Sequence, residues 1–293
     1  MREHDWLAER FEANRPHLRG VAYRMLGSLS EADDAVQEAW LRLSRTDTSG
    51  VDNLGGWLTT VVARVCLDML RSRTSRREES LDAQVTEPIA TGQAWIDPEQ
   101  EALLADSVGL ALLVVLDALT PAERLTFVLH DMFAVPFDEI GAIVGRSPTA
   151  ARQIASRARR RVRGAPRATG ADRARQREVV DAFLAALRSG DFEGLLAVLD
   201  PDLVVRTDAA AVAPGGAAEV RGARNWAKSA IAAARGARFA RPALVNGAVG
   251  VVVAPRGRLF RALTFTIAQG KIVRIDVIGD PARLRDLDLA VLD

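Results

Sequence analysis

The chain has 293 residues, of which 48% are hydrophobic and 26% charged, so it is long enough for two or three domains of about 100–150 residues that each bury a core. No run of about 18 apolar residues occurs and the N-terminal MREHDWLAER is strongly charged, so neither a membrane span nor an export signal is expected. Cys66 is the single cysteine, which excludes an internal disulfide and a cysteine-based zinc site, and we expect a cytoplasmic protein without metal or cofactor.

The N-terminal part of the chain is predicted to be helical. Apolar residues recur at helical spacing over 5–45, with a break at 28–31 and Ser30 as the cap of the second helix. A polar, glycine-containing loop is expected over 46–56. The next helix is predicted over 57–73, where Leu58, Val62 and Val65 belong to its apolar stripe. Residues 74–100 contain prolines and lack periodicity, which indicates a linker.

The middle of the chain is predicted to continue as short helices. One is expected over 101–119, and Thr120 caps another that runs to about Met132. A short helix begins at Pro136 and ends at Gly145. Ser147 caps a further helix that runs to about Arg163, and a glycine- and proline-containing linker follows over 164–170.

Beyond this linker the pattern changes from helical to mixed. Helices are expected over 173–189 and 192–199, followed by strands over 203–207, 243–246, 249–254, 258–268 and 272–278. The pairs at 246–247 and 269–270 are hairpin turn signals. The last third is therefore predicted to be an α+β domain with a curved antiparallel sheet.

The net charge of +1 conceals two blocks of opposite sign. Residues 81–145 carry eleven acids and one basic residue, Arg124, whereas residues 146–178 carry eleven arginines and two acids. Blocks of basic residues usually contact polyanions, and clustered arginine pairs well with phosphate and guanine. The alternative from charge alone is a solvated arginine-rich helix.

The arginine block coincides with a helix-turn-helix pattern. Gly145 permits the tight turn, and Ala151, Ile154, Ala158 and Val162 form a buried stripe on the second helix. Such a helix enters a major groove with its first turns on base edges, while arginines further along contact phosphates. The residues predicted to face DNA are Ser147, Thr149, Arg152, Gln153, Ser156, Arg157 and Arg160.

The helix at 57–73 is a second candidate for DNA contact. Thr60, Arg64 and Arg71 lie opposite its apolar stripe, and arginines at 73, 76 and 77 continue as a basic tail. Standing alone, the same pattern is also that of an ordinary core helix with solvated arginines. We include Thr60, Arg64, Arg71 and Arg73 among the predicted DNA-binding residues.

Three motifs in a fixed order resemble the extracytoplasmic-function sigma factors of bacteria: EADDAVQEAWLRL (31–43), WLTTVVAR (57–64) and ASRARR (155–160). The resemblance covers residues ~5–165. It implies a first module at 5–77 that binds core RNA polymerase and recognises the minus-ten element, a linker at 78–100, and a helix-turn-helix module at 101–165 that reads the minus-thirty-five element of promoter DNA. By this resemblance the polymerase-binding residues are Asp33, Asp34, Gln37, Glu38 and Trp40.

After a linker at 166–176, residues 177–293 resemble a SnoaL-like domain, a cone-shaped α+β fold with an open pocket for a small ligand. Sigma factors with this extension form a subgroup in which it regulates activity in cis. The subgroup carries Leu-Pro-Glu-Pro, Asp-Gly-Gly-Gly and Asn-Pro-Asp-Lys-Leu, where this chain has VTEP (85–88), DAAA (208–211) and DPARL (280–284). The expected protein is thus multidomain, with two all-α modules before an α+β domain.

The C-terminal domain is not expected to be an enzyme. Proton-transfer chemistry needs a base with a buried donor, but His4, His17, His130 and Tyr23 all precede this domain. Asp202, Asp208 and Asp276 remain as candidate bases, and surface acids are the simpler interpretation.

Two alternatives to a promoter-recognition subunit stay open at this point. One is a ligand-sensing repressor or activator with a helix-turn-helix, which leaves the helices at 20–73 without a role. The other is a bifunctional protein whose C-terminal domain turns over a small molecule. Run-off transcription with core RNA polymerase is the experiment that narrows these alternatives most.

Overall fold

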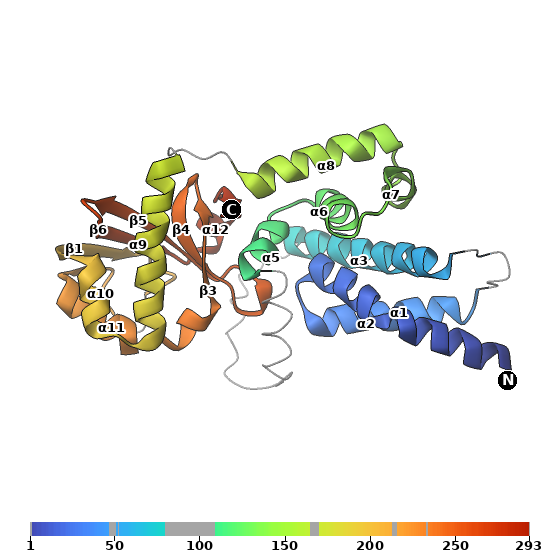
Figure 1. Cartoon of the computed structure of the whole chain (residues 1–293), viewed down its shortest axis with the longest axis horizontal. Helices are drawn as coiled ribbons and strands as arrows, with labels where there is room; N and C mark the ends of the chain where they lie inside the picture. Colours follow the sequence, from blue (N-terminus) through green and yellow to red (C-terminus); the bar gives the residue numbers. More distant parts are fainter. Residues whose placement is uncertain are drawn as a thin grey trace. The chain divides into compact units, whose positions relative to one another are not determined.

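The computed structural model describes residues 2–46, 51, 53–79, 109–164, 170–212, 216–232 and 234–292 (Figure 1). The chain forms two compact units. The N-terminal unit comprises Met1–Val108 and Leu119–Arg159, and the C-terminal unit comprises Gly109–Ala118 and Arg160–Asp293. Most of the linker expected at 78–100 and the start of the helix expected at 101–119 lie outside the described residues. Among the described helices, none has the length and apolar character needed to cross a membrane.

The N-terminal unit begins with three helices that pack on one another: α1 (Arg2–Leu26), α2 (Leu29–Leu43) and α3 (Leu54–Glu79). Two predicted starts were wrong. Ser28, not Ser30, caps α2, because its extended backbone lets its hydroxyl accept the Glu31 amide at 3.4 Å. Helix α3 begins at Leu54 rather than at 57, since the Asn53 side chain accepts the Gly56 amide at 3.0 Å and holds a glycine-containing turn in the helix.

The same unit continues with α6 (Pro121–Phe127), the π-helical turn η2 (Val128–Met132), α7 (Phe137–Val144) and most of α8 (Pro148–Arg163), whose last turn from Arg160 on belongs to the C-terminal unit. These bounds confirm the predicted helices. Thr120 and Glu123 form a reciprocal capping box at the start of α6, in which each side chain binds the other's backbone amide. Gly145 ends α7 in the left-handed conformation, with φ of 69°.

The C-terminal unit contains a seven-stranded sheet in the order β2-β1-β6-β5-β4-β3-β7. Its strands are β1 (Leu199–Thr207), β2 (Glu219–Arg221), β3 (Ala240–Val245), β4 (Ala248–Val253), β5 (Arg261–Ala268), β6 (Lys271–Ile278) and β7 (Leu289–Ala290). The predicted hairpins β3–β4 and β5–β6 are confirmed, but β1 and β6 pair in parallel, so the wholly antiparallel sheet was wrong. No local turn joins β1 to β6, because β2, β3, β4 and β5 lie between them in the chain.

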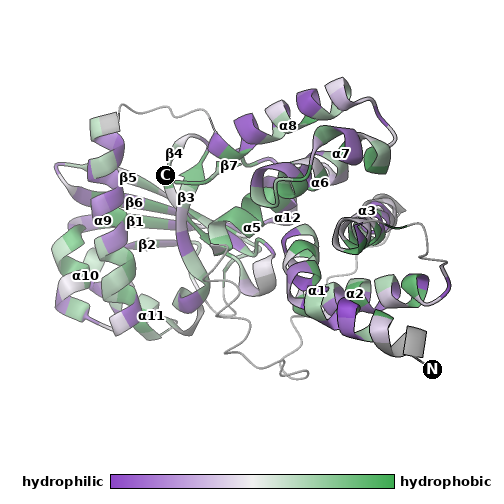
Figure 2. Cartoon of the chain, turned by 45° about the vertical axis from the view of Figure 1, so that its right-hand side comes forward, coloured by the Kyte–Doolittle hydropathy of each residue, from purple (hydrophilic) through white to green (hydrophobic). Residues whose placement is uncertain are grey.

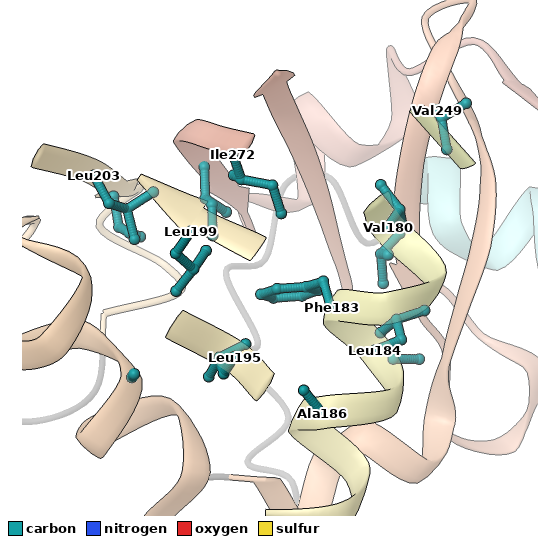
Figure 3. Close-up of a cluster of buried hydrophobic side chains, with 14 of the residues drawn as sticks. Val180, Phe183, Leu184, Ala186, Leu195, Leu199, Leu203, Val249 and Ile272 are labelled. Carbon is teal, nitrogen blue, oxygen red and sulfur yellow. The ribbon is translucent and has the colours of Figure 1, made fainter. Parts of the chain in front are cut away.

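Helices α9 (Gly170–Ser189), α10 (Phe192–Val198) and α11 (Ala223–Ala232) pack against the sheet. Figure 3 shows Phe183 directed from α9 into an apolar cluster with Leu195, Leu199 and Ile272. A smaller cluster joins Ala262 and Ile278 of the sheet to Leu284 of α12 (Pro281–Arg285). Strands β2 and β7 and helices α11 and α12 were not predicted.

Helix α5 (Leu110–Asp117) belongs to the C-terminal unit, where it contacts β3, β7 and the 3-10 turn η4 (Pro255–Gly257). Its buried side chains are Leu110, Leu113, Val114, Val115 and Leu116. Figure 2 shows α5 as predominantly hydrophobic and α8 with strongly hydrophilic turns. A helix that is apolar on most of its surface needs partners on more than one side. The sheet of the C-terminal unit supplies some of them.

Candidate nucleic-acid interface

The turn between α7 and α8 depends on two glycines. Gly145 adopts a left-handed backbone conformation that disfavours other residues. A Cβ on Gly141 would lie 2.7 Å from the carbonyl oxygen of Arg146, closer than a carbon and an oxygen pack. The Ser147 hydroxyl then accepts the Ala150 amide at 3.2 Å and begins α8. The turn therefore combines a left-handed backbone at Gly145, a close backbone approach at Gly141 and a side-chain cap from Ser147.

We expect Gly141→Ala to loosen this turn. The added methyl group must displace the backbone of Arg146, and overpacking of this kind costs about 1–3 kcal/mol. Amide hydrogen exchange over α7 and α8 should become about 5- to 150-fold faster, while α1–α3 should be unaffected. Ala142→Ser, on the exposed side of the same helix, is the control and should leave exchange unchanged. Equal exchange in Gly141→Ala and the native chain would show that the turn tolerates a side chain.

Helix α8 separates a buried stripe from an exposed face. Ala151, Ala155, Ala158 and Val162 are buried, and Ile154 is half-buried. All the residues predicted to face DNA from this helix are exposed: Ser147, Thr149, Arg152, Gln153, Ser156, Arg157 and Arg160. The face is thus available along the whole helix, with its polar side chains on the first turns and arginines along its length.

Arg152 is oriented by a stack of rings beneath it. Its guanidinium carbon lies 5.6 Å from the centroid of the Phe137 ring, and Phe137 stacks on His130 at 3.8 Å between ring centroids. The His130 ring is tied in turn by its Nδ1, 3.1 Å from the carbonyl oxygen of Val135. A guanidinium over an aromatic face loses rotational freedom but keeps its hydrogen-bond donors at the rim of the ring plane. The sequence pattern did not reveal this support, because η2 and the turn after it bring His130 under Phe137.

On α3 the predicted residues fall into two groups. Arg64 and Arg71 are exposed and Thr60 is half-buried. Arg73 instead forms an ion pair with Glu31 of α2 and donates to the carbonyl oxygen of Leu26 at 3.2 Å. Arg73 therefore ties α3 to the junction of α1 and α2. Arg64 and Arg71 are the arginines of this set that face solvent.

On α2 the predicted polymerase-binding residues also differ in environment. Asp33 pairs with Arg19 at 2.7 Å, Glu38 pairs with Arg42 at 2.9 Å, and the Trp40 ring lies 5.0 Å from that of Phe11. The exposed residues of the predicted set are Asp33, Asp34 and Gln37.

Leu41 extends this exposed face and was missed from the sequence. Its side chain is 40% exposed, and it lies four residues after Gln37 and seven after Asp34, so the three share one side of α2. The i, i+4 spacing was the available signal. Leu41 therefore adds an apolar side chain to the face that carries Asp34 and Gln37.

A buried arginine holds α6 within the N-terminal unit. Arg124 is 2% exposed, and its Nε donates to the carbonyl oxygen of Arg24 in the last turn of α1 at 3.3 Å. The Phe133 ring contacts His17 edge-on at 5.2 Å and lies under the Arg24 guanidinium at 5.2 Å. Burial raises the pKa of the nearby Cys66 thiol to about 12, so this cysteine is a packed, unreactive side chain.

In the C-terminal unit, two of the three candidate bases, Asp208 and Asp276, have structural partners. The Asp208 carboxylate accepts the backbone amides of Gly279 and Asp280, each at 2.9 Å. Burial raises the pKa of Asp208, but these hydrogen bonds outweigh it and the net pKa is lowered, the reverse of what a general base at neutral pH needs. Asp276 pairs with Arg274 at 2.7 Å. Over the described ranges, no three His, Cys, Asp or Glu side chains gather as a metal site.

Comparison with known proteins places these features in one family. Residues 10–76 match the family described as Sigma-70 region 2, and residues 109–162 match the family described as Sigma-70, region 4. The chain is 38% identical over 286 residues to the ECF RNA polymerase sigma factor SigJ of Mycobacterium tuberculosis (strain ATCC 25618 / H37Rv), covering 92% of this chain and 91% of SigJ.

A second relative is the probable ECF RNA polymerase sigma factor SigI of Mycobacterium tuberculosis (strain CDC 1551 / Oshkosh), which is 36% identical over 290 residues, or 98% of each protein. The crystal structure of Mycobacterium tuberculosis extracytoplasmic function sigma factor SigJ aligns at 34% identity over 94% of this chain and 96% of that chain, with a TM-score of 0.46. Because the sequence identity to SigJ and SigI extends over 92% and 98% of this chain, the chain belongs to the extracytoplasmic-function (ECF) sigma factors of RNA polymerase.

Proposed function

We propose that this chain binds core RNA polymerase and directs it to a specific set of promoters, with its C-terminal domain regulating that activity in cis. The observation that carries the proposal is the exposed face of α8, which presents Arg152 and Gln153 on its early turns and arginines beyond them. The match of residues 109–162 to Sigma-70, region 4 supports the same role for this helix.

Arg152 and Gln153 have the chemistry to read bases in the minus-thirty-five element. Arginine donates two hydrogen bonds to guanine, whereas a glutamine amide donates one hydrogen bond to adenine and accepts another from it. Arg157 and Arg160, later on the helix, suit the phosphate backbone. On α3, Thr60, Arg64 and Arg71 are the proposed contacts to the minus-ten element, and Arg73 supports them by fixing α3 to α1 and α2.

The face of α2 that carries Asp34, Gln37 and Leu41 is the proposed contact to core polymerase. Acidic and amide side chains around an exposed leucine form a polar rim about an apolar centre, which is the common anatomy of a protein interface. Asp33 and Glu38 contribute charge to the same helix while paired with Arg19 and Arg42. Trp40 supports the helix from inside, through its contact with Phe11.

The C-terminal domain is proposed to act by contact rather than by catalysis. Its candidate bases Asp208 and Asp276 are held by backbone amides and by an arginine. The Phe183 ring stacks on that of Trp226 at 5.9 Å between ring centroids and contacts that of Phe265 edge-on at 5.4 Å. A small ligand in an open pocket, implied by the SnoaL-like resemblance, stays a prediction. We also propose that the domain docks near residues 81–100 of the linker, which lie outside the described residues.

The test is reconstitution of the full chain with core RNA polymerase. We expect the purified chain to bind core enzyme and to start transcription at promoters mapped from transcript 5′ ends in cells that overproduce it. Leu41→Ala should weaken core binding, because it removes the apolar centre of the proposed contact, whereas Leu41→Met should bind like the native chain. A chain that binds neither core polymerase nor any mapped promoter would overturn the proposed function.

A further inference from the structure

The last turn of α8 is bonded to the end of the chain. The backbone amide of Val291 donates to the carbonyl oxygen of Val162 at 2.9 Å, and both residues belong to the C-terminal unit. Val291 directly follows β7, whose Ala290 pairs with Leu244 of β3 in the sheet. A carbonyl in the last turn of a helix has no partner within that helix, so this bond satisfies a group that is otherwise left open.

Gly164, which directly follows α8, lets the end of this helix approach β7 closely. It adopts a left-handed conformation, with φ of 63°, and its amide bonds back to the carbonyl oxygen of Arg160 at 3.0 Å. A Cβ placed on Gly164 would lie 2.4 Å from the Cβ of Ala290. Only glycine fits here, both for the backbone angle and for the approach to β7.

Strand β7 is itself fixed to the sheet by a reciprocal pair of bonds. The Asn246 amide donates to the Asp288 carbonyl oxygen at 2.7 Å, and the Asp288 amide donates to the Asn246 side-chain oxygen at 2.9 Å. Asn246 occupies the tight turn between β3 and β4, with φ of 53°. The end of α8 is therefore connected through β7 to a hairpin in the body of the sheet.

Helix α5, the first described helix of the predicted helix-turn-helix module, packs on the same strands, β3 and β7. Helix α5 falls within residues 109–162, the stretch that matches Sigma-70, region 4, and it contacts β3, β7 and η4. Thus the sheet of the C-terminal unit engages both ends of that stretch, through α5 at its start and Val162 at its finish.

We propose that β7 with Val291 is a clasp, closed on α5 and on the last turn of α8, through which the C-terminal domain sets the affinity of the minus-thirty-five helix for DNA. This inference rests on the proposed function and names the contact by which cis regulation acts. The clasp orders the start and end of the helix-turn-helix module before DNA is met, so less conformational freedom is lost on binding. It also fixes the helix end from which Arg160, Arg161 and Arg163 project. Opening the clasp therefore weakens upstream-element recognition.

The sharpest test compares Val291→Pro with Val291→Ala in the full chain. Proline lacks the amide that donates to Val162, and Ala290 already has the strand conformation that a residue before proline prefers. Alanine keeps the amide and is the matched control for loss of the side chain. Val291→Pro should speed amide exchange in the last turn of α8 and in α5 at least about tenfold relative to Val291→Ala. With core polymerase, it should lower transcription that depends on the upstream element about three- to tenfold.

Gly164→Ala is a second variant that acts at the other side of the same contact. Its methyl group would overlap Ala290, so it should reproduce the effect of Val291→Pro without altering the end of the chain. Both variants should retain core polymerase binding, which separates failure of the clasp from failure of the proposed function. Exchange and transcription equal to Val291→Ala, in a chain that still binds core polymerase, would overturn the clasp. Increased transcription in both variants would overturn the proposal that opening the clasp weakens recognition of the upstream element.

Discussion

Replacing Phe183 with alanine should destabilise the C-terminal domain by about 3–5 kcal/mol, the cost of removing a large aromatic side chain from a packed core. Phe183 is fully buried, stacks on Trp226 and contacts Phe265 edge-on. It projects from α9 into the apolar cluster that joins the helices to the sheet (Figure 3). A cavity at this position would leave the surrounding side chains without contacts that they cannot regain by small shifts.

The measurement is amide hydrogen exchange. A chain with two units need not unfold in one step, and exchange reports the stability of each unit separately. Exchange over α9 and β3–β6 should quicken, while α1–α3 should keep the native rate. Phe260→Ala is the matched control, since this phenylalanine is 37% exposed and should cost little. If Phe183→Ala left the strands as protected as in the native chain, the cluster would not be the core of the domain.

This variant also tests regulation in cis without deleting any part of the chain. Complete removal of the domain would also take away β3 and β7, the strands against which α5 packs, and so would disturb the helix-turn-helix module directly. Transcription that changes in Phe183→Ala, with core polymerase binding retained, would support a regulatory domain. Unchanged transcription at several promoters would argue against a regulatory role of the domain. It would favour the alternative in which the domain turns over a small molecule.

Arg152→Ala and Gln153→Ala should each weaken recognition of the upstream promoter element by about 1–3 kcal/mol and relax its sequence preference. Both residues are exposed on the early turns of α8, where a recognition helix meets base edges. The loss should be large for the preferred element and small for elements in which the contacted base is changed. The measurement is transcription by the reconstituted holoenzyme from a set of upstream elements that differ at one position each.

Arg160→Ala provides the contrast to these two variants. A phosphate contact carries no sequence information, so its loss should weaken binding to every element alike and flatten the salt dependence. If Arg152→Ala lowered transcription equally from all elements, Arg152 would contact the backbone rather than a base. Phe137→Leu should weaken recognition of the preferred element less than Arg152→Ala does. This variant removes the ring under the Arg152 guanidinium but leaves the guanidinium itself in place.

Several features of this protein could be predicted from the sequence because they are local. The helix-turn-helix follows from the left-handed Gly145, from Ser147, which caps α8 by accepting the amide three residues later, and from buried alanines at helical spacing. The capping box at Thr120 and the hairpins β3–β4 and β5–β6 have the same origin. In each case the partners lie within a few residues, so the pattern itself contains both halves of the interaction. The exposure of the α8 residues that are predicted to face DNA followed from the same periodicity.

The tertiary structure decided what depends on residues distant in the chain. The parallel pairing of β1 with β6, the bond from Val291 to Val162 and the ion pair of Arg73 with Glu31 each join segments separated by tens of residues. No local pattern specifies such a partner, because a strand edge, a helix-end carbonyl or an arginine can be satisfied by many groups. For the same reason α5, an apolar helix in sequence, gave no sign that it would pack on the sheet of the C-terminal unit. Which surface buries an apolar face is settled only when the whole chain has folded.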